Sequence, residues 1–336
     1  MRYIGVDLHR KMFEVCVISG TKRSHRQYQL KEIATFRKTL HKRDMIAVEA
    51  TGNTKYFVRQ IEDTVGRVVV VNPQQFKVIS QSTKKTDRRD AETLAVYLEK
   101  GLLPEVRMKD DVHSQLASMA HTRDQLVKLR TMLKNKIHNI LAAHGVETTR
   151  EAYSSQKELE KVLTLEVNAA AKVELQVIVE QIRHLNEGIA KLDQEMTDRG
   201  KKLEGYEQIT SIKGIGSKSG TILLSIIGNV QDFPNEKKLS AYFGMVPRVS
   251  NSSETIHYGH ITKCGSSLGR TTLVQCTLVA IKYSPYLRRF YDKLKAKKGS
   301  GKAIIVTARK LLGIIYLTLK NRWVFEDFPN FVLKTT

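Results

Sequence analysis

Short apolar stretches that alternate with amphipathic ones fill the first hundred residues and limit the possible folds most strongly. The expected elements are, in order, the strands YIGVDLH and FEVCVIS, a more polar strand over residues 25–30, a helix over 31–42, a strand ending at Ala50, a helix near 56–63 and the strand RVVVVNP. The run from Val68 to Val71 is too apolar for an exposed edge strand. Strands that alternate with helices predict an α/β layer.

The middle of the chain has helical periodicity. One amphipathic helix carries apolar residues three and four apart with basic residues between them: Leu126, Leu129, Leu133, Ile137 and Ile140. A second has a heptad seam of Leu175, Ile178, Ile182, Leu185, Ile189, Leu192 and Met196. The seam predicts a coiled coil or helical hairpin that also holds a dimer together. An ordinary bundle helix within one subunit is the alternative.

Composition changes again near Gly205, where glycine, serine and basic residues become frequent. We therefore expect an α/β domain over residues 1–110 with a helical extension to about 150, a helical coiled-coil linker over 151–204, and a mainly α-helical domain over 205–336.

Charge narrows the class of partner. Lys and Arg outnumber Asp and Glu by 56 to 34, a net charge of +22 spread along the chain. A field of this sign attracts phosphate backbones, so a nucleic acid is the expected partner. The three cysteines are widely separated and form no CxxC pair, which predicts neither a disulfide framework nor a zinc site. No apolar run approaches the roughly twenty residues of a membrane helix, so we expect a cytoplasmic protein with no membrane partner.

Four acidic residues stand where elements of the α/β layer begin or end. Asp7 follows one apolar strand, Glu49 ends another, and Asp87 and Asp90 share one face of a predicted helix. Carboxylates are the ligands that Mg²⁺ prefers, and two ions about 4 Å apart can bind both oxygens of a phosphodiester displacement. Each acid alone has an ordinary explanation, such as a helix cap or an ion pair. Together they predict a site for two magnesium ions.

Residues 212–228, IKGIGSKSGTILLSIIG, place a tight glycine turn between helical stretches. This pattern is typical of a helix-hairpin-helix element, whose turn contacts a DNA phosphate without reading sequence. The expected contacts are Lys213, Gly214, Gly216 and Lys218. A helix connection without a ligand is the alternative.

A polar segment follows, YFGMVPRVSNSSETIHYGHITKCGSSLGR. Its candidate nucleophiles are Ser250, Ser252, Ser253, Ser266 and Ser267. Its candidate phosphate-binding groups are Arg248, His257, His260, Lys263 and Arg270. Spacing alone does not choose among the serines, and a solvated loop is the alternative for the whole segment. Near the C-terminus, KKGSGKA lacks the spacing of a phosphate loop and is interpreted as a basic turn before a terminal helix.

Taken together, these segments resemble the transposases of the insertion-sequence-110 (IS110) family, relatives of the pilin-gene invertases. The resemblance rests on the ordered set GVDLH, AVEATG, KTDRRDAETLA, SIKGIG, GMVPRVSNSSETIHYGHITKCGSSLGR and KAIIVTARKLL, which covers essentially the whole chain.

The resemblance implies a RuvC-like, ribonuclease-H-type N-terminal domain whose Asp-Glu-Asp-Asp (DEDD) set binds Mg²⁺, here Asp7, Glu49, Asp87 and Asp90. It also implies a C-terminal transposase domain whose serine forms a phosphoserine with DNA. Such enzymes assemble as dimers that pair into tetramers, and a structured noncoding RNA selects the donor and target DNA.

The nucleophile has two candidates because the sequence departs from the family pattern. Ser252 fits by its distance from Pro247, but Ser253 and then Glu254 follow where the family usually has glycine, so Ser253 competes. Two other functions remain open. A junction-resolving RuvC-like nuclease would use water in place of serine, and a binding protein with a decayed site would have no activity.

Overall fold

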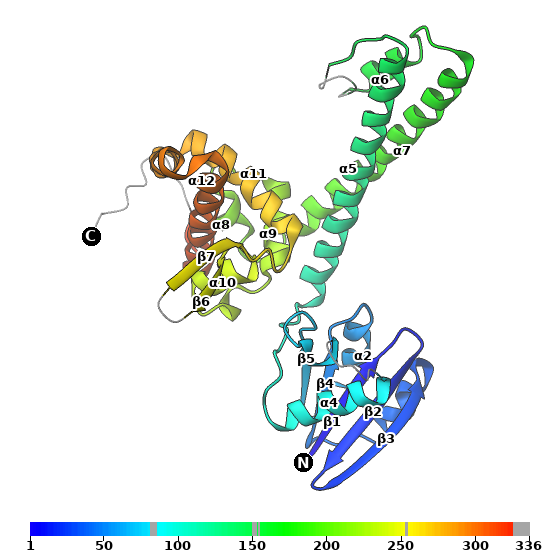
Figure 1. The fold of residues 1–336 in the computed structure, drawn as a ribbon, viewed down its shortest axis with the longest axis vertical. Helices are drawn as coiled ribbons and strands as arrows, with labels where there is room; N and C mark the ends of the chain where they lie inside the picture. Colours follow the sequence, from blue (N-terminus) through cyan, green and yellow to red (C-terminus); the bar gives the residue numbers. More distant parts are fainter. Residues whose placement is uncertain (81–85, 150–152, 154, 253–254, 325–336) are drawn as a thin grey trace. The chain divides into compact units, whose positions relative to one another are not determined.

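A computed structural model describes residues 1–80, 86–149, 153, 155–252 and 255–324. The chain forms two compact units, Met1–Met108 and Lys109–Thr336. Figure 1 follows the chain from its blue N-terminus to the red end of the last helix. No helix among the described residues has the length and apolar character needed to cross a membrane.

The first unit is built on a five-stranded sheet in the order β3-β2-β1-β4-β5. Its strands are β1 Arg2–Leu8, β2 Met12–Ser19, β3 Lys22–Gln29, β4 Asp44–Glu49 and β5 Arg67–Val71. The first three form an antiparallel meander, whereas β1, β4 and β5 run parallel. This mixed sheet confirms the predicted α/β layer.

One face of the sheet is covered by two short helices, α1 (Ile33–Arg37) and α2 (Thr54–Ile61). Phe13 of β2 lies at the centre of this core, with its ring 5.3 Å from Phe36 and 5.2 Å from Phe57 between ring centroids. Aromatic rings at these separations bury large areas and fix the distance between helix and sheet. The helix expected over residues 31–42 is shorter, because a 3-10 turn, η1 (Leu30–Glu32), precedes α1.

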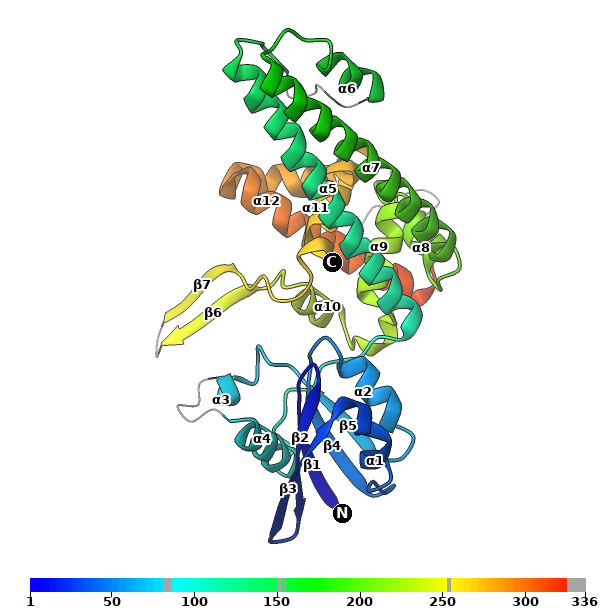
Figure 2. The same ribbon diagram turned by 90° about the vertical axis from the view of Figure 1, so that its right-hand side faces the viewer.

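The opposite face packs against α4 (Asp87–Glu99), which a short helix, α3 (Lys77–Ser80), precedes in sequence. Figure 2 shows α4 on one side of the sheet and α1 and α2 on the other. The contact between α4 and β1 is unusually close. An ideal Cβ added to Gly5 would overlap the carbonyl oxygen of Ala91 and lie 2.5 Å from the amide nitrogen of Ala95. Glycine in the strand and alanine in the helix therefore let the two backbones touch.

Two long helices open the second unit. They are α5 (Asp111–Ala143) and α7 (Ala169–Gly200), with α6 (Gln156–Val162) at their far end. The seam predicted for α7 is used within the chain, since four of its buried members share apolar clusters with residues of α5 or α6: Leu175, Ile178, Ile182 and Met196. The two helices therefore form a helical hairpin (Figure 1).

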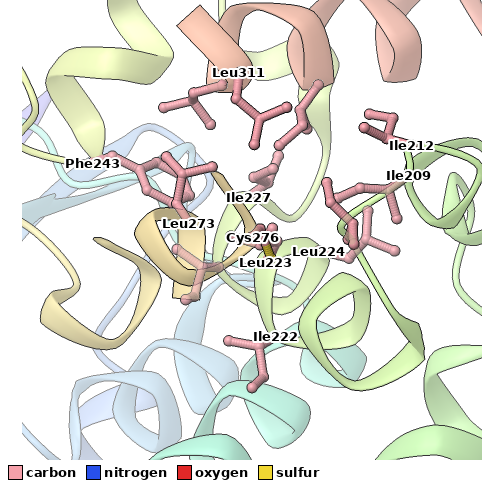
Figure 3. Packing of buried hydrophobic residues seen from close by; sticks show 14 of the residues in the cluster. Ile209, Ile212, Ile222, Leu223, Leu224, Ile227, Phe243, Leu273, Cys276 and Leu311 are labelled. Atoms are coloured by element: carbon pink, nitrogen blue, oxygen red, sulfur yellow. The ribbon is translucent and has the colours of Figure 1, made fainter. Parts of the chain in front are cut away.

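The rest of the second unit is a helical body around one large apolar core. Its helices are α8 Tyr206–Thr210, α9 Ser217–Ile227, α10 Glu236–Tyr242, α11 Ser267–Tyr283 and α12 Pro285–Asn321, with a 3-10 turn, η2 Val230–Asp232. α9 is the central element, because every residue from Gly220 to Ile227 is buried. Figure 3 shows its leucines and isoleucines packed against Phe243, Leu273 and Leu311 from α10, α11 and α12 and their ends.

The mainly helical body also carries two strands, which the sequence analysis did not predict. β6 (Pro247–Ser252) and β7 (Thr255–Ile261) pair as an antiparallel hairpin within the polar segment that contains the candidate serines. Val249 is 58% exposed and its cross-strand partner Tyr258 is 71% exposed. Figure 2 shows the hairpin extending away from the helices of its unit. Two strands without a covered face are marginally stable in water.

Replacement of Gly5 by alanine tests the close contact between β1 and α4. Because the added Cβ overlaps the backbone of Ala91, α4 must move away from the sheet. We expect the free energy of unfolding to fall by about 1–3 kcal/mol, the usual cost of overpacking. Gly52→Ala is the matched control in the same unit, since nothing lies within 4 Å of its Cβ position. Equal urea midpoints for Gly5→Ala and Gly52→Ala would contradict the close packing of α4 on β1 at Gly5.

Replacement of Gly188 by alanine should have the opposite effect. Gly188 lies inside α7, and its Cβ position meets only Leu126 Cδ1 at 3.5 Å, an ordinary contact. Alanine is favoured over glycine in a helix by up to about 1 kcal/mol. Thermal unfolding followed by circular dichroism should show a higher Tm for Gly188→Ala, and an unchanged or lower Tm would mean that the helical hairpin needs the glycine.

Candidate active site

Asp7 and Glu49 stand at the carboxyl ends of neighbouring parallel strands. β1 pairs with β4 in a register that joins Gly5 to Ala47 and Val6 to Val48. The next positions along the two strands are Asp7 and Glu49. Alternation along a strand puts both on the face of Gly5 and Ala47, which is the face that α4 covers.

The N-terminus of α4 brings two further acids to the same place. Thr86 caps the helix by accepting a hydrogen bond from the amide of Arg89 at 3.4 Å, and Asp87 is the first helical residue. Asp90 follows after three residues and is buried, with 6% exposure. Since Ala91 rests on Gly5, the helix turn that holds both acids lies at the end of β1. All four predicted acids therefore come from the elements that meet at this edge of the sheet.

His9 links two of these carboxylates. Its Nε2 atom lies 3.2 Å from Asp7 Oδ2 and 3.3 Å from Asp87 Oδ2. One ligand atom from each of these three residues falls within 4.8 Å of the others, which is close enough for them to share a metal ion. His9 is the last residue of the motif GVDLH, and no role was predicted for it. Its position two residues beyond Asp7 could have placed it in the site, because side chains two residues apart in an extended chain lie on the same side.

Burial is the largest influence on Asp7 and raises the pKa of its carboxyl above the usual value. His9 opposes this effect, and the negative charges of Asp87 and Asp90 add to it. A carboxylate whose charge is disfavoured by burial and by like charges is stabilised by a bound cation. The cluster consists of hard oxygen donors, which suit Mg²⁺ or Mn²⁺, with one imidazole at its exposed side. The residues present therefore fit a divalent metal.

The predicted serines occupy the second unit. The backbone of Ser252 ends β6, opposite Thr255 of β7, while Ser253 lies outside the described residues. Ser250 is exposed and pairs across the hairpin with His257, which is also exposed. The structure thus places the main candidate at the end of a projecting hairpin, and the carboxylates belong to the other unit.

Two predicted residues have structural partners near this hairpin. Ser266 caps α11 by accepting a hydrogen bond from the amide of Gly269 at 3.1 Å. Arg270 donates to the carbonyl oxygens of Phe243, Cys264 and Gly265 at 3.1–3.2 Å. This guanidinium therefore holds the loop between β7 and α11 in place. Ser267, the first residue of α11, is exposed.

Three of the predicted phosphate-binding side chains remain exposed around the hairpin. These are Arg248 on β6, His260 on β7 and Lys263 just beyond it. Lys263 has a positive φ of 56°, a conformation that few residues other than glycine adopt without the support of their surroundings. These three side chains are therefore accessible to solvent, and their binding to phosphate stays a prediction.

The predicted helix-hairpin-helix turn lies between α8 and α9. Lys213 is exposed, and Gly216 caps α9 with open space at its Cβ position. Gly214 has a φ of 105° and packs on α11, where a Cβ would come within 2.7 Å of the Ala280 amide nitrogen. Lys218 donates to Asp193 of α7 at 2.5 Å.

The same carboxylate accepts from Arg123 of α5. Burial raises the pKa of Asp193, but hydrogen bonds from Arg123 and Lys218 outweigh it and hold that pKa below its usual value. Lys218 therefore also ties the turn to the long helices, a role that the sequence analysis missed because its partner lies 25 residues away.

Comparison with known proteins identifies both parts of the chain. A transposase family model for the DEDD domain of IS110 elements matches residues 4–145. The model of the transposase IS116/IS110/IS902 family matches residues 206–292. The first match includes all four carboxylates, and the second includes the turn before α9 and the β6–β7 hairpin.

Similar curated proteins extend over nearly the whole chain. The transposase for insertion sequence element IS1111A of Coxiella burnetii is 25% identical and covers 97% of this chain and 92% of its own length. The pilin gene-inverting protein of Moraxella bovis is 25% identical over 96% of this chain and 97% of its own length. A probable family 20 transposase of Pseudomonas aeruginosa is 24% identical, with 81% of each chain covered. The chain therefore belongs to the IS110 family of transposases and is an enzyme of DNA recombination.

Proposed function

We propose that this transposase cuts and rejoins DNA with a magnesium-binding carboxylate set in the first unit and a serine nucleophile in the second. The observation that carries the proposal is the convergence of Asp7, Asp87 and His9 at the edge of the sheet, where Asp90 raises the pKa of Asp7 further. Glu49 completes the set from the neighbouring strand.

Asp7, Glu49, Asp87 and Asp90 are the proposed metal ligands. Two Mg²⁺ ions bound there would act as Lewis acids on the phosphate that is attacked. The chain's own contribution is geometric and electrostatic. Gly5 fixes α4 against β1, and the partly buried carboxylates form a site with high negative charge before DNA arrives.

Ser252 is the proposed nucleophile, with Ser253 as its competitor. Its oxygen attacks phosphorus, the bond from phosphorus to one DNA oxygen breaks, and that oxygen leaves with a proton. The phosphoserine ester keeps the bond energy until a hydroxyl of another DNA end displaces the serine. Support comes from the backbone position of Ser252 at the end of β6 and from two exposed cations near the other end of the hairpin, Arg248 on β6 and Lys263 just beyond β7.

The remaining parts of the proposal concern assembly and guidance. We propose a structured noncoding RNA as a second ligand for the net charge of +22, and a homodimer that pairs into a tetramer. The domain limits near residues 110, 150 and 205 also remain predictions. RNA binding by the full chain tests the guide RNA, and the oligomeric mass tests the dimer and tetramer. The stability of the separated segments tests the domain limits.

A water-using nuclease is the second candidate. It is favoured by one observation, that the metal-ligand candidates all belong to the first unit and need no residue of the second for their arrangement. In that case the hairpin serves only to bind DNA.

Asp7→Asn should stabilise the metal-free protein while it removes metal binding. Because the folded protein raises the pKa of Asp7, it holds the proton more tightly than the unfolded chain does, and ionisation costs stability as pH rises through the ordinary carboxyl range. Asparagine removes that cost. In EDTA at pH 7 we expect a gain of up to about 1 kcal/mol in unfolding free energy, the scale of a single-site effect.

The gain from Asp7→Asn should shrink as pH falls from the raised pKa of Asp7 towards about 4, and should vanish below that, where the folded and the unfolded wild type both bind the proton. Added Mg²⁺ should raise the Tm of the wild type but leave the variant unchanged. Asp124→Asn, at a half-buried position on α5, is the control for loss of one negative charge. If Mg²⁺ raises the Tm of Asp7→Asn as much as that of the wild type, Asp7 is not a metal ligand.

A covalent-adduct assay decides between serine and water. Labelled DNA is incubated with the full chain, Mg²⁺ and the element's own RNA, and then run on a denaturing gel. We expect a protein–DNA adduct with the wild type, its loss in Ser252→Ala and in Asp7→Ala, and its retention in Ser253→Ala and Ser250→Ala. The reductions should reach a hundredfold or more, as roughly expected when a nucleophile is removed. Cleaved DNA without an adduct in any variant would establish the water-using nuclease.

A further inference from the structure

We infer that the first half of α12 binds the phosphate backbone of duplex DNA. This cationic segment covers residues 285–302, from the start of α12 to just beyond its kink at Gly299. Most of the cationic segment lies beyond the family match, which ends at residue 292. The segment belongs neither to the carboxylate site nor to the serine hairpin. The inference rests on DNA as the substrate and is independent of which group attacks it.

Charge is the first observation. The cationic segment has seven basic side chains against one acid, Asp292, whose carboxylate binds Arg288 at 3.2 Å. The other six basic residues are all exposed: Arg289, Lys293, Lys295, Lys297, Lys298 and Lys302. Among the residues that the structure describes, none of these six is in an ion pair with a carboxylate.

Other exposed helices in the same chain neutralise their cations locally. Arg199 pairs with Glu195 at 2.6 Å in α7, and Lys128 pairs with Asp124 at 2.6 Å in α5, both four residues apart. In the cationic segment the corresponding neighbours are like charges, as for Lys293 and Lys297. Like charges at this spacing destabilise a helix, so the arrangement is unfavourable without a polyanion.

Arg289, Lys293 and Lys297 form a row on one side of the helix, next to a side that is packed. Leu287 is fully buried, and Phe290, Tyr291 and Leu294 are partly buried on the same face. Gly299 has φ 76° and ψ 164°, so the helix bends there and the second half of α12 returns to the core. Figure 1 shows this bend between the orange and red parts of α12. Lys298 and Lys302 flank the bend.

Spacing matches an extended polyanion better than a small anion. Arg289, Lys293 and Lys297 are four residues apart on one face of the helix, and the row spans about 12 Å at a rise of 1.5 Å per residue. One strand of a DNA duplex carries about three or four phosphates over that length of the axis. The row therefore contacts several phosphates of one backbone at once.

The chemistry of the cationic segment favours a duplex over a single strand. Single-strand binding surfaces stack exposed bases on exposed aromatic rings. Within this segment Phe290 and Tyr291 are on the packed side, and Lys310 lies over the Tyr286 ring at 5.8 Å from its centroid. Contacts to a regular phosphate backbone need only cations, and such contacts position the protein without reading sequence.

The test is a binding measurement on the full chain in EDTA, so that metal-dependent cleavage does not contribute. The variant Arg289→Gln/Lys293→Gln/Lys297→Gln removes one row of charges. Lys31→Gln/Lys38→Gln/Lys42→Gln is the matched control, because these three exposed lysines of the first unit change the net charge equally. Fluorescence anisotropy with a 30-base-pair DNA duplex gives Kd at several salt concentrations.

We expect the variant to raise Kd by about tenfold or more relative to the control at moderate salt. The slope of log Kd against log salt should fall by up to about 2.7, since each lost phosphate contact contributes about 0.9. A duplex RNA of the same sequence is measured in parallel. Equal affinities of variant and control for DNA would overturn the proposal, and so would a variant that loses only RNA binding.

Circular dichroism tests whether the triple variant is folded. If the variant is unfolded, Lys295→Gln/Lys298→Gln/Lys302→Gln removes an equal charge from the same segment, and its Kd is compared with that of the same control. Because DNA binding is measured without cleavage, an unchanged Kd in the charge variant would refute the proposed DNA contact without bearing on the serine mechanism. Loss of the adduct with normal binding would refute only that mechanism.

Discussion

The backbone contact between β1 and α4 determines where the chemistry of the first unit takes place. Gly5 has no side chain, and Ala91 and Ala95 present only methyl groups, so helix and strand meet at their main chains. Interiors are close-packed and transmit displacements of this kind. The first turn of α4 therefore has little freedom relative to the end of β1, and the carboxylates that it carries share that restraint.

The same arrangement has an electrostatic cost. The Asp7 side chain is 15% exposed and lies near two other acids. Among the described residues, His9 is the one basic residue within ion-pair distance of its carboxylate. Elsewhere carboxylates are paired with arginine or lysine, as Asp193 is with Arg123 and Lys218. Acids gathered at one edge of the sheet in a chain with net charge +22 are best explained by selection for a ligand, since the repulsion between like charges favours their dispersal.

Elements with strong local patterns were predictable from sequence, whereas long-range partners were not. The strands around Val6, Val48 and Val70 and the start of α4 at Asp87 follow from apolar runs and a threonine cap. The β6–β7 hairpin was missed because its residues are mostly polar, and none of those whose burial the structure describes is buried to reveal the period. The roles of His9 and Lys218 were missed because each depends on a partner brought near only by the fold.

The position of the carboxylates was predictable in outline for a related reason. Acids at the ends of parallel strands meet at one edge whatever the details of packing, so Asp7 and Glu49 could be placed from the strand order. Their geometry could not, because it depends on how closely α4 approaches Gly5. Ser252 has no such constraint in the sequence, since five serines share one polar segment and only folding separates capping residues such as Ser266 from the others.

Because the α5–α7 hairpin is long, a small rotation at one of its ends displaces the other end by a large distance. Helices of 33 and 32 residues extend about 50 Å at 1.5 Å per residue. Leu116 and Met196 anchor one end in the core of the helical body, while a separate apolar cluster around Ile137 and Leu175 stiffens the other end. A rotation of 10° at the anchored end moves the far end by about 9 Å at this length. Small repacking steps in the helical body are thus amplified into displacements comparable to the width of a helix.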